Sequence, residues 1–354
     1  MPERSPENTL GGQPLLERVC VPFLLGAQNA DGGWGYRNGG QSAVEPTSWV
    51  LLALKEVEES TSREVEKPRT VQLLNFSTPQ LLNSFNAGVR WLRESQLSNG
   101  SWPSFAGQPR GCWVTAAASL ALYTHRDPPD RVARGLHWLV ETWPVEGRLW
   151  RRIGAKLLRR DRVVRMDLSL RGWSWTPGTA SWVEPTSCAL IAFHRVPQEL
   201  HPRGAARRRQ LAERMLYDRM CPGGGWNSGN PLVYGAAGVP RIGPTVWALL
   251  ALQDYRARPE TRGSLDWLEQ AYSQIQGPGS LALAHLCLLL YNRPAPALEP
   301  SLAALNSNNQ FLGIRWWRPG RRWRWVAYRA GCRRKSETRK WELESASYFQ
   351  GSGF

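Results

Sequence analysis

Apolar residues recur along this chain at helical spacing, in two alternating kinds of segment. Segments of the first kind carry apolar residues three and four positions apart on one face; they cover 15–28, 82–96, 132–142, 205–220 and 265–275. Segments of the second kind are apolar all round; they cover 47–57, 115–123, 186–196, 245–255 and 280–291. One-sided helices cover a core and all-round apolar helices lie inside it. The alternation therefore predicts an all-α fold of inner and outer helices.

A loop containing Gly and Trp, followed by an inner helix that begins at Thr, occurs at least three times. A repeat of a few tens of residues indicates stacked units that share one core. Five complete helix pairs are readable, and a sixth outer arm begins near 299–305. We therefore expect an α/α toroid, a closed ring of about six helical hairpins. The three copies are Gln28–Trp34 with Thr47, Gln96–Trp102 with Thr115, and Gly224–Trp226 with Thr245.

The pattern divides the chain into a flexible N-terminus over 1–14, a toroid domain over 15–313 and a tail over 314–354. Within the toroid, the polar segment 58–80 is expected to be a surface loop. A long insertion over 144–182 contains an Arg-rich stretch at 151–165 and then Trp173, Trp175 and Trp182. Two interpretations are open for it: a substrate loop, or a solvated basic helix before a Trp-rich turn.

The chain carries a net charge of +16, and half of this charge lies in the tail. Residues 315–354 contain eleven basic and three acidic residues, interleaved with Trp and without a helical or strand period. A basic, Trp-rich segment is typical of binding to RNA or to an anionic membrane. The abrupt change of composition where the next helix is due fits equally a non-native end, such as a frameshift. We expect no nucleic-acid partner for the toroid itself.

The remaining composition points to a cytoplasmic protein, with peripheral membrane contact as an option. No apolar run reaches about 18 residues and the N-terminus lacks the order of a signal peptide. The six cysteines are scattered without a Cys-x-x-Cys pair, which favours reduced thiols over disulfides or a zinc site. We expect no metal and no cofactor. The Arg stretch at 151–165 is a candidate contact for anionic headgroups.

The second repeat unit resembles the Gln-Trp repeat of squalene–hopene cyclases, in the prenyltransferase/squalene-oxidase-repeat superfamily. The likeness rests on Ala87–Gln96 followed by Gly100-Ser101-Trp102, and it extends over roughly 15–313. The first unit matches the pattern, the third has Thr142 where the glutamine is expected, and the fourth lacks the glutamine. The resemblance implies an α/α toroid that cyclises an isoprenoid lipid through a proton-initiated carbocation.

The same resemblance identifies candidate catalytic acids. In these cyclases an Asp-x-Asp-Asp motif precedes a Thr-led inner helix, and its middle Asp protonates the isoprenoid. Here Glu45 is the only carboxylate at that place before Thr47, and Glu184 holds the same position before Thr186. A carboxylic acid among apolar groups has a raised pKa and can act as a general acid. The alternative is structural, because an acid followed by Pro and Thr is a common helix start.

Aromatic residues supply the candidate substrate-binding groups, because aromatic π faces stabilise cations. They are Trp49, Trp113, Trp182, Trp247 and Tyr234.

Three functions stay open at this point. The first is a cyclase of the isomerase type acting on an isoprenoid or other hydrophobic small molecule. The second is a non-catalytic homologue that binds isoprenoid or another lipid, which the missing aspartates favour. The third is a toroidal glycosidase or polysaccharide lyase, since paired carboxylates also cleave sugars. Zinc-dependent prenyl transfer is disfavoured, because no Asp-x-Cys segment follows Gly225-Trp226.

Overall fold

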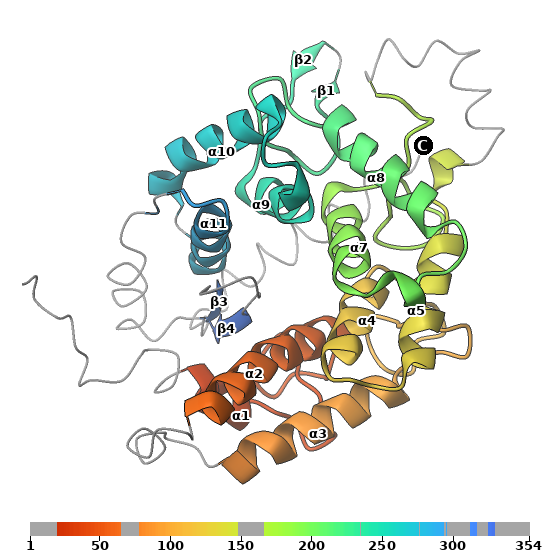
Figure 1. Cartoon of the computed structure of the whole chain (residues 1–354), viewed down its shortest axis with the longest axis vertical. Coiled ribbons are helices and arrows are strands. Elements are labelled where there is room, and N and C mark those ends of the chain that lie inside the picture. The colour runs from red at the N-terminus through yellow and green to blue at the C-terminus, as the bar shows by residue number, and fades with distance from the viewer. Residues whose placement is uncertain are drawn as a thin grey trace, which may run out of the picture.

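The computed structural model describes residues 20–64, 78–147, 166–233, 235–275, 277–293, 295, 312–316 and 325–329. Ten α-helices in these ranges form a ring in which long helices alternate between an inner and an outer layer (Figure 1). This confirms the predicted all-α toroid. The outer helices are α1 (Val21–Gly26), α3 (Thr78–Glu94), α5 (Pro129–Glu141), α8 (Ala205–Asp218) and α10 (Pro259–Ala271). The inner helices are α2 (Val44–Glu64), α4 (Thr115–Thr124), α7 (Val183–Arg195), α9 (Ile242–Ala251) and α11 (Pro278–Leu290).

The inner helices follow one another around the ring in chain order, each packed on the next. Their all-round apolar sequences are explained by burial: every residue from Thr115 to Leu122 of α4 is buried, as is every residue of α7 from Pro185 to Phe193. Short 3-10 turns follow several helices, namely η3 (Val145–Gly147), η5 (Gln198–Leu200), η6 (Gln253–Tyr255) and η7 (Tyr272–Gln274).

Two small antiparallel hairpins complete the described structure. Strands β1 (Leu232–Val233) and β2 (Ala236–Ala237) lie in the loop before α9. Strands β3 (Leu312–Trp316) and β4 (Trp325–Arg329) pair with Leu312 opposite Arg329 and Trp316 opposite Trp325. This second hairpin packs between α11 and α2 and closes the ring where a sixth inner helix was expected (Figure 1). The sixth outer arm predicted near 299–305 lies outside the described residues.

The expected surface loop over 58–80 is wrong at both ends. Helix α2 continues to Glu64 and helix α3 already begins at Thr78, while 65–77 lies outside the described residues. Polar residues extend a helix readily where it leaves the core, so polarity alone did not mark a loop here. Strands β3 and β4 were not predicted either, because their sequence lacks a regular alternation of apolar and polar residues.

One hydrogen-bond arrangement recurs in four units and joins each loop to both of its helices. The backbone N–H of the loop Trp donates to the hydroxyl of the Thr near the start of the inner helix. The indole N–H of the same Trp donates to a Leu carbonyl of the preceding outer helix. The backbone bonds are Trp34–Thr47 (2.9 Å), Trp102–Thr115 (2.9 Å), Trp173–Thr186 (2.9 Å) and Trp226–Thr245 (2.8 Å). The indole bonds reach Leu24 (2.7 Å), Leu92 (2.7 Å), Leu139 (2.8 Å) and Leu216 (2.6 Å).

Trp173 is therefore the repeat tryptophan of the third unit. The end of the predicted insertion over 144–182 is a regular repeat loop, although the sequence before it departs from the Gly-Gly-Trp pattern. The Arg-rich stretch at 151–165 lies outside the described residues.

Glycines let each loop approach the outer helix of the next unit. Gly32 has φ +93°, and a Cβ atom there would lie 2.7 Å from the Ala87 carbonyl oxygen. Gly100 has φ +88°, and its Cβ would lie 2.6 Å from the carbonyl oxygen of Arg134. Only glycine combines this left-handed conformation with so close an approach.

A glutamine side chain also joins the loop to the outer helix of the next unit. Gln28 Nε2 donates to the Gly32 and Ser84 carbonyls, at 2.7 Å each, and Gln96 Nε2 makes the equivalent bonds to Gly100 and Arg131. These bonds tie one unit to the outer helix of the next.

In the third unit the glutamine position is filled by Trp143. Counting from the Leu that accepts the indole bond, Gln96 is four residues after Leu92, and Trp143 is four residues after Leu139. The sequence assignment of Thr142 was therefore wrong by one residue. Arg208 of α8 takes the place of the glutamine in bonding the loop to the next outer helix. Its guanidinium donates to the Arg171, Gly172 and Thr142 carbonyls.

Candidate functional site

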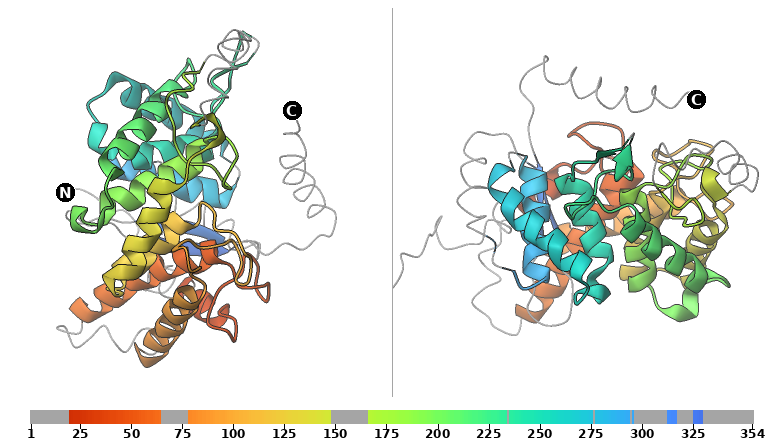
Figure 2. Two further views of the ribbon diagram at one scale, coloured as in Figure 1. Left: turned by 90° about the vertical axis from the view of Figure 1, so that its right-hand side faces the viewer. Right: turned by 90° about the horizontal axis from the view of Figure 1, so that it is seen from above.

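The candidate site lies on the face of the ring where all five inner helices begin. The four repeat loops gather on this face (Figure 2). In each loop, the residue two positions after the repeat Trp lies against the start of an inner helix. Carbonyls at this loop position accept backbone bonds from the preceding unit: Ser104 from Val44 (3.0 Å), Trp175 from Trp113 (3.2 Å) and Ser228 from Val183 (3.3 Å). In the first loop the residue is Tyr36, whose side chain contacts Glu45.

Glu45 is half-buried in the first turn of α2 and is held by two donors. The Tyr36 hydroxyl donates to its Oε2 at 2.5 Å, and the Trp49 indole, four residues further along α2, also donates to the carboxyl. The Tyr36 ring is 54% exposed and packs edge-on against Phe105, with ring centroids 6.2 Å apart. Tyr36 therefore joins the Glu45 carboxyl to the outer surface of the loop layer.

Burial raises the pKa of Glu45, while the hydrogen bonds from Tyr36 and Trp49 pull it in the opposite direction. The charge of Glu45 also affects two thiols. Burial raises the pKa of Cys112 and of Cys188, and the Glu45 charge raises both pKa values further. Cys112 precedes the neighbouring helix α4 and Cys188 lies on α7, one helix further round the ring, so the charge of Glu45 acts on both helices. A carboxyl whose pKa is raised holds its proton to higher pH, as a general acid must.

Trp49 and Trp247 contact one another from α2 and α9. Their ring centroids lie 5.5 Å apart with an interplanar angle of 39°. Both residues stand two positions after the repeat Thr, and the equivalent positions on α4 and α7 are the smaller Ala117 and Cys188. Four helical residues rise about 6 Å, so the pair lies one turn below Glu45. The structure thus brings Glu45, Trp49 and Trp247 together.

Of the other predicted aromatic residues, two are described in the structure and one is not. Trp113 is half-buried at the start of α4 and packs edge-on against Trp175, with ring centroids 4.8 Å apart and planes at 85°. Trp182 is half-buried just before α7, and its backbone N–H donates to the Trp173 carbonyl at 3.0 Å. Tyr234 lies outside the described residues. The roles of these residues in binding a substrate stay predictions.

Glu184 has different partners from Glu45, although it holds the equivalent position on α7. Burial raises its pKa, and its own backbone N–H, the Ser228 hydroxyl and the charge of Arg241 lower it. Its Oε2 is buried and accepts no hydrogen bond within the described part of the chain. Glu184 thus faces the loop of the next unit. Each carboxyl therefore has its own set of partners.

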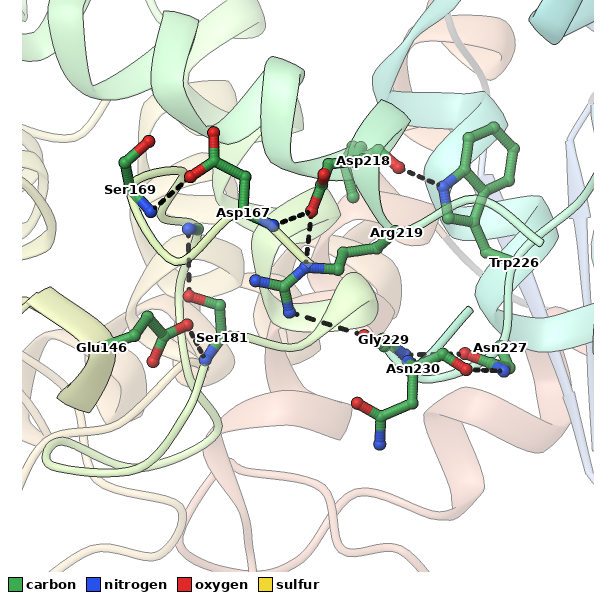
Figure 3. A network of polar contacts seen from close by, with 12 residues as sticks. Glu146, Asp167, Ser169, Ser181, Asp218, Arg219, Trp226, Asn227, Gly229 and Asn230 are labelled. Atoms are coloured by element: carbon green, nitrogen blue, oxygen red, sulfur yellow. Dashed lines mark hydrogen bonds and ion pairs between the residues drawn. The ribbon is translucent and has the colours of Figure 1, made fainter. Parts of the chain in front are cut away.

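A polar network holds the loop that carries Ser228 (Figure 3). Asn227 Oδ1 accepts the backbone N–H groups of Gly229 (3.0 Å) and Asn230 (2.9 Å), forming a turn around Ser228. The buried Arg219, after α8, donates to Asp218 (3.1 Å) and to the Gly229 carbonyl (3.5 Å). The Asn-rich turn, which the sequence could explain only as a polar loop, therefore positions a group against Glu184.

The structural interpretation of both acids also fits the geometry. Glu45 and Glu184 lie in the first turns of α2 and α7, each followed by Pro, where the helix dipole favours a negative charge. A helix start alone, however, requires neither the Tyr36 bond nor the contact with Trp49. These contacts distinguish Glu45 from an acid that serves only as a helix start.

The described residues contain neither a metal-binding cluster nor a membrane-spanning helix. No group of three or more His, Cys, Asp or Glu residues there is arranged to hold a metal ion. Across the same residues, no helix combines the length and apolar character needed to span a bilayer.

Tyr36, Trp175, Ser228, Arg241 and the thiols of Cys112 and Cys188 were not predicted as site residues. For three of them a signal was present, because Tyr36, Trp175 and Ser228 share one position relative to the repeat Trp. For the others no sequence signal was available, since only the closed ring brings them to Glu45 or Glu184.

Comparison with known proteins agrees with this fold. An alignment of 98 positions with lanosterol synthase from Homo sapiens is 32% identical and covers 25% of this chain and 10% of that enzyme. The chain thus spans only about a tenth of the relative it matches. The apo structure of the type II terpene cyclase MstE from Scytonema superposes with a TM-score of 0.50 and 14% identity, over 82% of this chain and 77% of that one.

Candida albicans protein geranylgeranyltransferase-I, solved with GGPP, gives a TM-score of 0.42 and 14% identity over 68% of this chain and 60% of that one. No protein-family model matches the chain.

The fold is an α/α toroid like that of type II terpene cyclases. The similarity to lanosterol synthase over a quarter of the chain is distant homology to an enzyme of the terpene cyclase/prenyltransferase superfamily.

Proposed function

We propose that the protein acts on an isoprenoid lipid and starts a carbocation cyclisation by protonating a carbon–carbon double bond from Glu45. One observation carries the proposal: Glu45 has a raised pKa, is held by Tyr36 and Trp49, and lies one helical turn above the Trp49–Trp247 pair. The lipid itself is inferred from the superfamily and from the aromatic character of these neighbours.

The chemistry requires only groups of this chain and the substrate. The π electrons of the alkene form a new C–H bond with the carboxyl proton of Glu45, and the electrons of the broken O–H bond remain on the carboxylate. The positive charge is then left on a substrate carbon, where the indole faces of Trp49 and Trp247 stabilise it. Ring closure consumes a second double bond, and the final cation then gives a proton back to the Glu45 carboxylate, which regenerates an alkene and the neutral acid.

A second candidate function is a non-catalytic lipid-binding protein. Burial favours the protonated form of Glu45 but also makes it a weaker acid, and protonating an alkene demands a strong one. Among the described residues, no cationic side chain contributes to the pKa of Glu45, which leaves two neutral donors to stabilise its carboxylate. The same site would then hold an apolar chain against the two indoles without changing it.

Incubation of the full-length protein with squalene and polyprenyl substrates, followed by mass spectrometry of the lipid extract, separates these functions. We expect a cyclised product from the wild type, its loss in Glu45→Gln, and its retention in Glu184→Gln as the matched control. If Glu184→Gln forms no cyclised product while Glu45→Gln still does, Glu184 on α7 is the catalytic acid. Lipid that co-purifies unchanged, without product from any substrate, would support the binding protein.

A further inference from the structure

Tyr36 contacts Glu45 in a way that helix formation does not require. Its hydroxyl donates to Oε2 of Glu45 at 2.5 Å, near the short end of the range for a hydroxyl–carboxyl bond. More than half of the Tyr36 ring is exposed, so the residue gives up burial of an aromatic ring to reach this carboxyl. The loop that carries it is fixed by pairing of Gly35 with Ser42 and by a turn from Arg37 to Gly40.

The groups around Glu45 are otherwise neutral donors or thiols. The Trp49 indole donates from α2, Cys112 lies at the start of α4 and Cys188 lies on α7. Burial raises the pKa of both thiols, so they stay protonated at neutral pH. Of these groups, Glu45 is therefore the one that releases its proton first as pH rises.

We infer that Tyr36 is a positioning residue that fixes the proton of Glu45 on Oε1 and stabilises the carboxylate left after transfer. An oxygen that accepts a short bond from Tyr36 acts as the carbonyl oxygen of the neutral acid, which leaves the O–H on the other oxygen. When the proton departs, the bonds from Tyr36 and Trp49 become charge-assisted and strengthen. Two neutral donors thereby stabilise this carboxylate, as neighbouring charges do in other active sites.

This inference rests on the proposed function for its consequence in catalysis, but its physical content can be measured without substrate. Infrared difference spectra of full-length wild type against Glu45→Gln, recorded over a pH series, isolate the C=O stretch of the neutral Glu45 carboxyl. In Tyr36→Phe we expect that band to move to higher frequency and its titration midpoint to rise by about one pH unit. This shift corresponds to a tenfold weaker acid.

Tyr217→Phe is the matched control, because the Tyr217 hydroxyl contacts Thr261, a residue outside the site. It should change neither the band nor the midpoint. The exposed ring at Tyr36 makes Tyr36→Phe compatible with folding, and circular dichroism melting verifies this. An unchanged band and midpoint in Tyr36→Phe would overturn the inference, and so would the absence of any neutral-carboxyl band that disappears in Glu45→Gln.

The catalytic consequence is tested separately. If the wild type forms a cyclic product, Tyr36→Phe should lower kcat about tenfold, leave KM nearly unchanged and move the decline of kcat at high pH upward. If no substrate reacts while the infrared shift is observed, the role of Tyr36 stands and the proposed cyclase activity fails. A rise in KM with kcat unchanged would assign Tyr36 to substrate binding and overturn the positioning role.

Discussion

Trp49 and Trp247 meet across the ring with their centroids 5.5 Å apart, from helices that are not neighbours. Helices α4 and α7 separate α2 from α9 on one side, and α11 separates them on the other. An indole pair that reaches across the ring narrows its centre at this level. The same level holds only Ala117 and Cys188 from the helices between them.

This pair predicts a limit on the length of a bound apolar chain. Trp247→Ala removes one half-buried indole, and we expect a loss of about 2–3 kcal/mol in the free energy of unfolding, below the range for a fully buried Trp. It should also admit longer isoprenols, which native mass spectrometry with a series of chain lengths can measure. Trp113→Ala, one turn nearer the loops, is the control. The same length limit in both variants would contradict the prediction.

The two candidate acids show what the sequence could and could not determine. Val44–Ser48 and Val183–Ser187 are identical pentapeptides, and both form the first turn of an inner helix. The fold follows from such local patterns, because helical spacing and the Thr–Trp bond depend on residues close in sequence. The site does not, because Glu45 differs from Glu184 through residues that only the closed ring brings near.

The third repeat shows which sequence pattern identifies a repeat tryptophan. Arg171-Gly172 stands where the other loops have Gly-Gly or Gly-Ser, and 31 residues stand between Glu141 and Trp173. The start of the loop therefore did not identify Trp173 as a repeat residue. Its spacing could have done so, because Trp173 precedes Thr186 by 13 residues, as Trp34 precedes Thr47. Counting two positions on from each repeat Trp would have predicted Tyr36 and Ser228 once this register was known.

The raised pKa of Glu45 predicts a pH-dependent stability. Because the folded state holds the proton more tightly than the unfolded state, the free energy of unfolding falls as pH rises from the unfolded pKa through the folded one. The slope is at most about 1.4 kcal/mol per pH unit. Glu45→Gln cannot ionise, so its stability relative to wild type should increase as pH rises above the ordinary pKa of a Glu side chain, about 4.3.

Urea unfolding across this pH range measures the effect. Glu184→Gln serves as the comparison, and its slope should be shallower because Ser228 and Arg241 counteract the effect of burial. Parallel stability curves for Glu45→Gln and wild type would show that the Glu45 carboxyl has the same pKa in both states.

Two helical glycines predict opposite effects of the same substitution. A Cβ atom at Gly135 would lie 2.3 Å from the Ser119 hydroxyl oxygen and 2.9 Å from the Trp102 ring, so Gly135→Ala should cost about 1–3 kcal/mol. Gly263 lies on the exposed side of α10, and no atom lies within 4 Å of its Cβ position. There the gain in helix propensity should stabilise the protein by about 0.5–1 kcal/mol. Thermal melting of both variants measures the pair, and equal shifts would refute the close packing around Trp102.

Arg208 predicts that arginine and lysine are not interchangeable in the third unit. Its guanidinium lies between the rings of Trp143 and Trp173, 4.2 and 4.3 Å from their centroids, and bonds to three carbonyls. A planar guanidinium can stack and donate in several directions at once, whereas an ammonium group cannot.

Arg208→Lys should therefore lower the free energy of unfolding by about 2–3 kcal/mol, as for a buried group that loses charge-assisted bonds. Arg207→Lys is the matched control, because Arg207 is exposed on the same helix. Urea unfolding should leave this control within about 0.5 kcal/mol of wild type. If both variants unfold at the same urea concentration, Arg208 does not tie the third unit to α8.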